Sequence, residues 1–257
     1  MKAVILAGGL GSRLSEETYL KPKPMVEIGT QPIIWHIMKH LSFYGINEFV
    51  ICLGYKGYII KEYFMNYIYH LSDININLND NSVEILNNLT EKWKVTLIET
   101  GEDTSTGGRI KKIANQLSDN ENFILTYGDG LSNVNINKLT QHHIDSKKLA
   151  TVTAVKPPGR FGALNIEKDT VIRFEEKPLG DGGYINGGFF VLNKKIIGYI
   201  NGDDSVWEQE PLKKLSSECQ LNAFVHDGFW AAMDTLRDKR YLEELWRSNK
   251  APWKVWD

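Results

Sequence analysis

Short apolar segments alternate with longer segments of helical spacing through the first 150 residues, and this alternation restricts the fold more than any other feature of the sequence. A strand, a helix and a second strand in succession form a crossover unit, which places both strands parallel in one sheet. The segments expected as strands are 4–6, 49–53, 95–98 and 123–127, and those expected as helices are 33–44 (just after Pro32), 61–69, 107–117 and 136–147. The pattern predicts an α/β fold.

The rhythm of the elements changes in the second half of the chain. Short strand-like runs cover 149–155, 163–166, 171–175 and 185–192, and the tail alternates a helix (208–216), a strand (221–225) and a helix (236–248). Residues 71–88 are rich in Asn and predict an irregular hairpin. No linker rich in Ser, Gly or Pro divides the sequence, and it has no internal repeat. We therefore expect a single domain over 1–257, built on a mixed, mainly parallel sheet with helices on both faces.

The charges of the chain nearly cancel, with 30 Lys and Arg against 32 Asp and Glu and a net charge of −2. This balance excludes a surface that binds a polyanion throughout, so no nucleic-acid partner is expected. No apolar run approaches the roughly 18 residues of a membrane helix, so no membrane partner is expected either. Cys52 and Cys219 form neither a disulfide framework nor a zinc motif. The chain is therefore expected to be cytoplasmic.

The strongest local signal is a glycine-rich turn directly after the first expected strand. Glycines there let backbone N–H groups approach phosphate oxygens, because no Cβ stands in the way. The arginine that follows adds a forked cation that stays charged. The turn is neither a P-loop nor a Rossmann dinucleotide fingerprint, since the lysine and the spacing differ, and a simple tight turn is the alternative. The segment reads Leu6, Ala7, Gly8, Gly9, Leu10, Gly11, Ser12, Arg13.

A second candidate phosphate contact is the motif Lys21-Pro22-Lys23-Pro24-Met25. Each proline fixes its own φ and biases the preceding lysine toward extended geometry. A lysine stiffened in this way can reach a phosphate with little ordering entropy left to lose. An isolated motif of this kind is more often a solvated basic loop. Both motifs together, in this order, are much more specific for a phosphate site.

These two motifs, followed by Gln31-Pro32-Ile33, resemble the signature of the sugar-1-phosphate nucleotidylyltransferases. The resemblance covers essentially the whole chain and implies a Rossmann-like fold of the nucleotide-diphospho-sugar transferase type. One departure is Ser12, where the family commonly has Thr, and both residues keep a hydroxyl. Longer strings resemble the branch of the family that uses CTP and glucose 1-phosphate, at 14–18, 21–29, 54–58, 106–109, 157–164, 207–212, 233–238 and 251–254.

The resemblance implies transfer of CMP from CTP to α-D-glucose 1-phosphate, which gives CDP-glucose and pyrophosphate. A sugar phosphate oxygen attacks the α-phosphorus in line, so no covalent enzyme intermediate is required. The protein must align two anions, offset their repulsion and stabilise charge in the transition state. By resemblance, Arg13 and Lys23 are the catalytic residues. The family also tends to form homo-oligomers, and we expect a trimer or hexamer.

The nucleotide is expected in the first half of the chain, over 1–150. The segment 106–109 opens a helix, where free N–H groups can bind carbonyl or phosphate oxygens. Arg109 could contact the cytosine carbonyl or a phosphate, and the alternative is an exposed arginine paired with a neighbouring acid. The residues expected to bind the nucleotide are Leu6, Ala7, Gly8, Gly9, Leu10, Gly11, Ser12, Arg13, Lys23, Thr104, Gly107, Arg109 and Gly128.

The sugar phosphate is expected in the second half, over 151–257. By resemblance, Glu176 accepts from sugar hydroxyls and Lys177 pairs with the sugar phosphate, although surface salt bridges are the alternative for both. Trp230 could stack on the sugar or fill the core. The residues expected to bind the sugar phosphate are Gly162, Glu176, Lys177, Asn186, Gly187 and Trp230.

Two carboxylates are candidates for holding Mg²⁺. Asp129 follows an expected strand between two glycines, and Asp234 precedes the final helix. Taken alone, the first reads as a turn residue and the second as the N-cap of that helix. The resemblance assigns both to the metal, and carboxylates with nucleotide phosphate oxygens suit a hard, partly hydrated ion. His36 and His40 lie four apart on an expected helix, but no third metal ligand is evident.

Three other functions are compatible with these motifs. The same chemistry could use UTP or dTTP in place of CTP. A regulatory homologue could bind sugar nucleotides without catalysis, although the presence of Arg13, Lys23, Asp129 and Asp234 together speaks against it. A metal-dependent glycosyltransferase of similar topology would need a sugar-nucleotide donor and would not consume free CTP.

Overall fold

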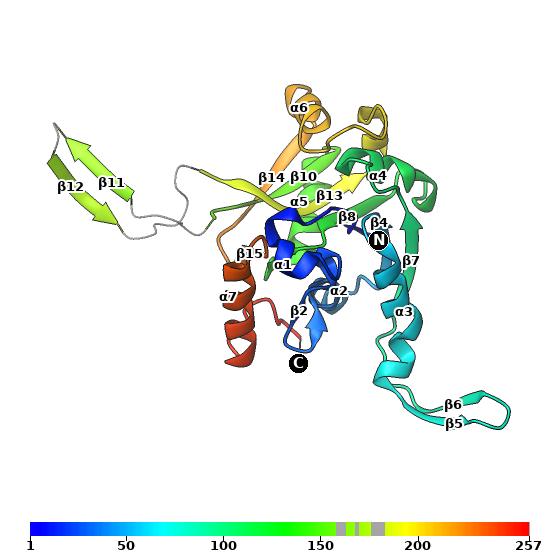
Figure 1. Cartoon of the computed structure of the whole chain (residues 1–257). Helices are drawn as coiled ribbons and strands as arrows, with labels where there is room; N and C mark the ends of the chain where they lie inside the picture. The colour runs from blue at the N-terminus through cyan, green and yellow to red at the C-terminus, as the bar shows by residue number, and fades with distance from the viewer. Residues whose placement is uncertain (158–162, 168–169, 176–182, 257) are drawn as a thin grey trace.

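Strands from both halves of the chain share one seven-stranded sheet, in the order β14-β10-β13-β8-β1-β4-β7 (Figure 1). A computed structural model of the chain describes residues 1–157, 163–167, 170–175 and 183–256, with the backbone alone for Arg13, Ser15, 163–167 and 173–175. The strands of this sheet are β1 (Ala3–Leu6), β4 (Glu48–Leu53), β7 (Lys94–Glu99), β8 (Asn122–Tyr127), β10 (Ala150–Val155), β13 (Ile185–Asn193) and β14 (Leu221–His226).

The sheet is mixed and mainly parallel, as the sequence predicts. β1 pairs in parallel with β4 and with β8, and β4 pairs in parallel with β7. β10 and β14 are also parallel. β13 runs antiparallel to both of its neighbours, β8 and β10, and so joins the two parallel groups. The expected α/β fold is therefore confirmed.

Helices α2 to α7 lie close to the expected segments, whereas α1 was not predicted. α3 begins four residues earlier than predicted, at Gly57, and α4 ends at Lys112 before a separate 3-10 turn, η3 (Ala114–Gln116). Within the described ranges, no helix is long and apolar enough to cross a membrane. The helices are α1 (Ser15–Thr18), α2 (Ile33–Phe43), α3 (Gly57–Leu71), α4 (Thr106–Lys112), α5 (Ile136–Ser146), α6 (Glu210–Ser217) and α7 (Leu236–Arg247).

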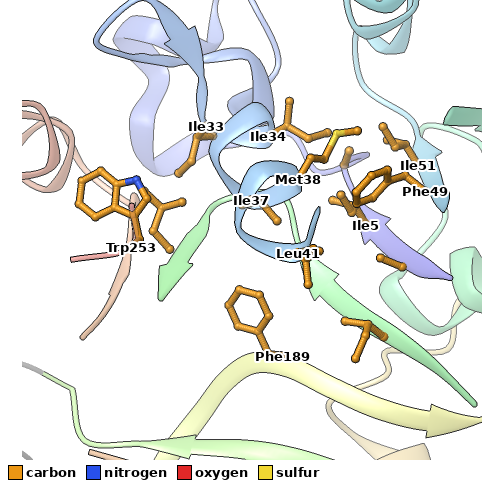
Figure 2. Close-up of a cluster of buried hydrophobic side chains, with 14 of the residues drawn as sticks. Ile5, Ile33, Ile34, Ile37, Met38, Leu41, Phe49, Ile51, Phe189 and Trp253 are labelled. Atoms are coloured by element: carbon orange, nitrogen blue, oxygen red, sulfur yellow. The ribbon is translucent and has the colours of Figure 1, made fainter. Parts of the chain in front are cut away.

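Apolar side chains on the two faces of the sheet form two separate cores. Along β1, Ala3 and Ile5 belong to one core and Val4 and Leu6 to the other, because successive strand side chains point to opposite faces. The first core packs against α2, whose buried residues Ile33, Ile37 and Leu41 recur one turn apart (Figure 2). The second core packs against α4, α6 and the 3-10 helix η4 (Lys194–Tyr199). Helices therefore cover both faces of the sheet.

Several short elements were not predicted from the sequence. β9 (Gly130–Ser132) pairs with β15 (Trp230–Ala232), and β2 (Glu27–Ile28) pairs with β3 (Gln31–Pro32). The 3-10 helices η1 (Ser12–Leu14) and η2 (Lys23–Met25) lie in the same part of the chain. Elements of two or three residues are too short to show a hydrophobic period, so sequence patterns do not reveal them.

The expected hairpin at 71–88 is present and more regular than predicted. β5 (Asp73–Asn77) and β6 (Ser82–Asn87) form a two-stranded ribbon that projects from the end of α3 (Figure 1). Its register pairs Ile74 with Ile85 and Ile76 with Val83, so these four side chains share one face. Ile76, Val83 and Ile85 are exposed. β11 (Ala163–Glu167) and β12 (Thr170–Glu175) also pair only with each other among the described strands.

Two buried histidines on α2 predict how stability depends on pH. His36 Nε2 donates to Ile28 O at 2.9 Å, and His40 Nε2 bonds Val134 O at 3.0 Å. Burial lowers the pKa of each from 6.5 to about 4. The unfolded chain therefore binds more protons than the folded chain between pH 6.5 and about 4. The free energy of unfolding should fall as the pH drops through this window, by about 3 kcal/mol for each histidine.

Denaturant titrations at pH 7, 6 and 5 measure this dependence. His40→Gln should remove about half of the pH-dependent loss that the two histidines produce. His70 is exposed on the last turn of α3, so His70→Gln should leave the dependence unchanged. Equal slopes for His40→Gln and the parent chain would show that other groups govern the loss.

Candidate active site

A cleft of about 500 Å³ opens where β1 and β8, two parallel neighbours in the sheet, reach their carboxyl ends. Open α/β sheets bind ligands at this edge, and the volume suits a small molecule. Leu6 and Tyr127, the last residues of the two strands, both line it. The complete lining is Leu6, Ala7, Gly9, Gly11, Ser12, Lys23, Pro24, Thr104, Ser105, Thr106, Arg109, Tyr127, Gly128, Asp129, Val206 and Asp234.

The glycine-rich turn forms one wall of the cleft. Gly11 has a φ of 64°, in the left-handed region that favours glycine, and a Cβ there would lie 2.7 Å from Thr18 Cγ2. The Thr18 hydroxyl donates to Gly11 O and Leu14 O, both at 3.0 Å, and holds the turn in place. Leu10 is 60% exposed and does not line the cleft. Arg13 contributes its backbone to η1, and its side chain lies outside what the structure describes.

Arg109 is almost fully buried beneath this turn. Its Nη1 donates to Leu53 O at 2.9 Å, to the Thr100 hydroxyl at 2.7 Å and to Gly101 O at 2.8 Å. Its Nη2 donates to Gly8 O at 3.0 Å and to Glu102 O at 3.1 Å. One guanidinium therefore ties the glycine turn to the ends of β4 and β7.

These contacts change the interpretation of two predicted residues. Arg109 is 4% exposed, so the alternative of a surface arginine paired with an acid is wrong. A Cβ at Gly8 would overlap the Arg109 guanidinium, so Gly8 makes room for that side chain. Gly8 itself does not line the cleft, whereas Arg109 does. Contact between Arg109 and the base or a phosphate stays a prediction.

The start of α4 forms a second wall of the cleft, and one expectation about its N–H groups is wrong. Thr104 is buried, lines the cleft and accepts from Lys112 Nζ at 3.1 Å. Gly107 N–H donates to Ser205 O at 2.8 Å, and Gly108 N–H donates to the same oxygen at 3.2 Å. The expectation that these N–H groups are free is therefore wrong. Gly107 packs against Ser205 and does not line the cleft.

Lys23 joins the two predicted metal ligands in the lining of the cleft. Its Nζ lies 2.6 Å from Asp129 Oδ2 and 2.7 Å from Asp234 Oδ1. The pairing of β9 with β15 brings these distant carboxylates together, and Met233 N–H donates to Asp129 O at 2.9 Å. Lys23 begins η2 directly after Pro22, and its side chain is only 11% exposed. A lysine held so firmly is not the solvated basic loop of the alternative interpretation.

Charge at this cluster favours a cation between the carboxylates. Burial by itself would lower the pKa of Lys23, but Asp129 and then Asp234 outweigh it, so the pKa is raised above its ordinary value. The ammonium therefore marks a point where a positive charge is stabilised by two carboxylate oxygens. This donor set fits Mg²⁺, which takes carboxylate oxygens together with phosphate oxygens and water. Among the described residues, no larger group of His, Cys, Asp or Glu could hold a metal.

Asp234 does not cap the final helix, contrary to one of its two expected roles. The N-cap of α7 is Thr235, whose side chain accepts from Asp238 N–H at 3.3 Å. The Asp238 carboxylate in turn accepts from Thr235 N–H at 2.8 Å, which completes a capping box. Asp234 stands one residue before the cap, and its carboxylate points at Lys23 instead.

Three of the predicted sugar-site residues lie together beside the cleft. Trp230 Nε1 donates to Gly187 O at 2.7 Å, so the indole is anchored to β13. Trp230 is only partly buried, so it does not simply fill the core. Asn186 Nδ2 donates to the Tyr127 hydroxyl at 3.2 Å. Gly162, Glu176 and Lys177 lie outside the described residues.

Five lining residues were not in the lists of predicted site residues: Pro24, Thr106, Tyr127, Ser105 and Val206. Ser105 adjoins Thr104, which was predicted. Pro24, Thr106 and Tyr127 belong to motifs in which another residue was predicted to be functional, namely Lys23, Arg109 and Asp129 respectively. Val206 comes from a loop far along the chain and carries no local signal. Proximity to a motif could have indicated the first three.

Comparison with known proteins places this cleft in a family. Residues 2–231 match the family model described as nucleotidyl transferase. Glucose-1-phosphate cytidylyltransferase of Salmonella typhi is 56% identical over 257 residues, with both chains covered completely. The chain belongs to the nucleotidyl transferase family. It is therefore an enzyme, and the expected resemblance is confirmed.

Two further relatives of this nucleotidyl transferase cover nearly all of it. A probable glucose-1-phosphate cytidylyltransferase of Bacillus subtilis is 44% identical over 257 residues, again with both chains covered completely. The crystal structure of HddC from Yersinia pseudotuberculosis superposes with a TM-score of 0.70 at 27% identity, covering 95% of this nucleotidyl transferase and 99% of HddC. The structural match and the family match therefore cover nearly the whole chain.

Proposed function

We propose that the enzyme transfers CMP from CTP to α-D-glucose 1-phosphate. An oxygen of the sugar phosphate attacks the α-phosphorus of CTP, the bond from that phosphorus to the bridging oxygen breaks, and pyrophosphate leaves with the bond's electrons. CDP-glucose is the second product. Among possible nucleotides and sugars, CTP and glucose 1-phosphate are favoured by the names of the relatives at 56% and 44% identity.

The cluster of Lys23, Asp129 and Asp234 in the lining of the cleft is the observation that supports this type of reaction. In-line transfer between two anions needs positive charge at the reacting phosphates, held in place before the substrates arrive. Lys23 supplies this charge from a rigid, proline-bounded position. We assign Arg13 to the same phosphates, in keeping with its place in η1 beside the turn.

In this proposal, each half of the chain binds one of the two substrates. Residues 1–150 hold the nucleotide, mainly through the glycine turn, Thr104 and Gly128. Residues 151–257 hold the sugar phosphate through Asn186, Gly187 and Trp230, together with Gly162, Glu176 and Lys177. Lys177 pairs with the sugar phosphate and Glu176 accepts from its hydroxyls. The contact of Trp230 with Gly187 O supports a common pocket for those two residues.

Asp129 and Asp234 are the residues that would hold Mg²⁺. When bound with the nucleotide, the ion supplies charge neutralisation at the phosphates and orients them. In the structure the Lys23 ammonium lies between these two carboxylates, and its charge would add to that of the ion at the phosphates. The two oxygens that now face Lys23 Nζ at 2.6 and 2.7 Å support this assignment.

Pyrophosphate release tests the proposed function. The purified enzyme is mixed with Mg²⁺, glucose 1-phosphate and one of CTP, UTP, dTTP or GTP, with the sugar phosphate omitted as a control. CTP should give the highest kcat/KM, by at least about tenfold. Equal or faster release with UTP or dTTP would identify a different nucleotide. No release above the control with any nucleotide would favour a binding protein without catalysis.

We also propose a homo-oligomer, a trimer or hexamer, and a cytoplasmic location. The apolar face of the β5–β6 ribbon supports assembly, since Ile76 is 51% exposed and Ile85 is 40% exposed, and an isolated ribbon of two strands is at best marginally stable in water. Ile76→Glu should reduce the mass measured by light scattering after gel filtration. Asn75→Glu changes the opposite face of β5 and should leave the mass unchanged. A parent chain that elutes as a monomer would contradict the assembly.

A further inference from the structure

Glu208 lies behind the wall of the cleft, between two residues that line it. Its Oε2 accepts from the Thr106 hydroxyl at 2.7 Å, and its Oε1 accepts from the Tyr127 hydroxyl. Thr106 is the first residue of α4 on the nucleotide side, and Tyr127 is the last residue of β8. Glu208 itself does not line the cleft. It therefore acts on any ligand only through these two neighbours.

Further hydrogen bonds connect Tyr127 to the sugar side of the cleft. The Tyr127 hydroxyl accepts from Asn186 Nδ2 at 3.2 Å, and Asn186 Oδ1 accepts from Gly188 N–H at 2.8 Å. Both ends of the Asn186 amide are thereby held in a defined orientation. At the other end, the Thr106 hydroxyl accepts from Trp207 N–H at 2.9 Å, so it too has a fixed direction. One continuous series of bonds runs from α4 to β13.

A carboxylate is the side chain that this position requires. Two hydroxyl groups donate to it, one to each oxygen, and only a carboxylate offers a separate acceptor oxygen to each. Tyr127 is also fixed by its ring, which packs edge-on against Phe190 with centroids 6.4 Å apart.

We propose that Glu208 is a positioning residue that sets the nucleotide wall and the sugar wall of the cleft at a fixed distance from each other. This inference rests on the proposed function, because it assigns the two walls to the two halves of CDP-glucose. Holding two reactants in register accounts for much of the rate of a transfer reaction, and small misplacements lower it strongly. Loss of Glu208 therefore affects the joint placement of the substrates more than the binding of either one.

Glu208→Gln and Tyr127→Phe break this series at adjacent links, and their kinetics and binding test the proposal. For each variant, we expect the Kd of CTP alone to stay within about threefold of the parent enzyme. The Kd of CDP-glucose, which spans both walls, should rise at least about tenfold, and kcat should fall at least about tenfold. The double variant should lose little more than the worse single variant, since both changes break one connection.

Glu210→Gln is the matched control, because this nearby carboxylate on α6 is 81% exposed in its side chain and pairs with Lys213 on the surface. It should leave all three measurements unchanged. The proposal is overturned if Glu208→Gln keeps the parent values of kcat and CDP-glucose affinity. It is also overturned if CTP affinity falls as much as CDP-glucose affinity, or if the losses multiply in the double variant.

Measurements on the parent enzyme distinguish a failure of this inference from a failure of the proposed function. A parent enzyme that binds no CDP-glucose and releases no pyrophosphate from CTP overturns the proposed function, and the inference with it. A parent enzyme that does both, with variants that match it, overturns the inference alone. If Glu208→Gln does not fold, Tyr127→Phe breaks the link between Glu208 and Asn186 and carries the same expectations.

Discussion

Lys23→Ala should lower kcat by at least about 10²- to 10³-fold, the loss typical of removing one charge-stabilising donor from a transfer site. Lys23 Nζ lies 2.6 Å from Asp129 and 2.7 Å from Asp234, and all three residues line the cleft. The side chain is 11% exposed, so water cannot replace the ammonium with equal effect. Steady-state pyrophosphate release with CTP and glucose 1-phosphate measures the change.

Lys21 provides the control within the same motif. It stands two residues away, carries the same charge and pairs with Glu27 at 2.7 Å on the surface. Exposed pairs of this kind contribute little, so Lys21→Ala should keep kcat within about twofold. Both variants should remain folded by circular dichroism, since neither lysine belongs to the apolar cores. If Lys23→Ala turned over at a rate close to that of Lys21→Ala, Lys23 would have no catalytic role.

Asp129→Asn and Asp234→Asn should each raise the Mg²⁺ concentration needed for half-maximal turnover, by at least about tenfold. Loss of even an indirect metal contact costs about 10- to 100-fold in metal affinity or activity, and these carboxylates are assigned as direct ligands. Complete chelation with EDTA should abolish turnover of the parent enzyme. Titration of Mg²⁺ against rate, at saturating CTP and glucose 1-phosphate, gives the values.

The Mg²⁺ titration separates two roles that both carboxylates could have. Each one also pairs with Lys23, so a lower kcat by itself would not identify a metal ligand. Lys23→Ala should lower kcat without raising the Mg²⁺ requirement. Asp227 is exposed, and Asp227→Asn should behave like the parent enzyme. If the carboxylate variants lost kcat at an unchanged Mg²⁺ requirement, Asp129 and Asp234 would act on Lys23 rather than on a metal.

Much of the fold follows from patterns within short stretches of the chain. The period of apolar residues in α2 and in the strands of the first half is visible in sequence, because it records which face each element buries. The positions of η2 and the glycine turn also have local causes, in the φ of Pro22 and the left-handed φ of Gly11. For that reason Lys23 and the cleft-lining glycines could be selected before the structure was known.

Other features depend on contacts between segments that are far apart in the chain. Asp129 and Asp234 meet because β9 pairs with β15, and strands of three residues have no period to detect. Arg109 is buried because its acceptors come from the glycine turn and from the ends of two strands. No spacing around Arg109 distinguishes it from an exposed helix arginine, and the same holds for the packing of Gly107 against Ser205.

By itself, the sequence determined the α/β architecture, the glycine-rich turn and the identity of the lysine, since each depends on periodicity or on backbone geometry within a few residues. Only the tertiary structure decided that Lys23 lies between two carboxylates, that Arg109 anchors the turn from below, and that Glu208 links Thr106 to Tyr127. Hydrogen bonds of charged side chains depend on which distant backbone and carboxylate oxygens the fold brings within about 3 Å. That information is absent from any local stretch of residues.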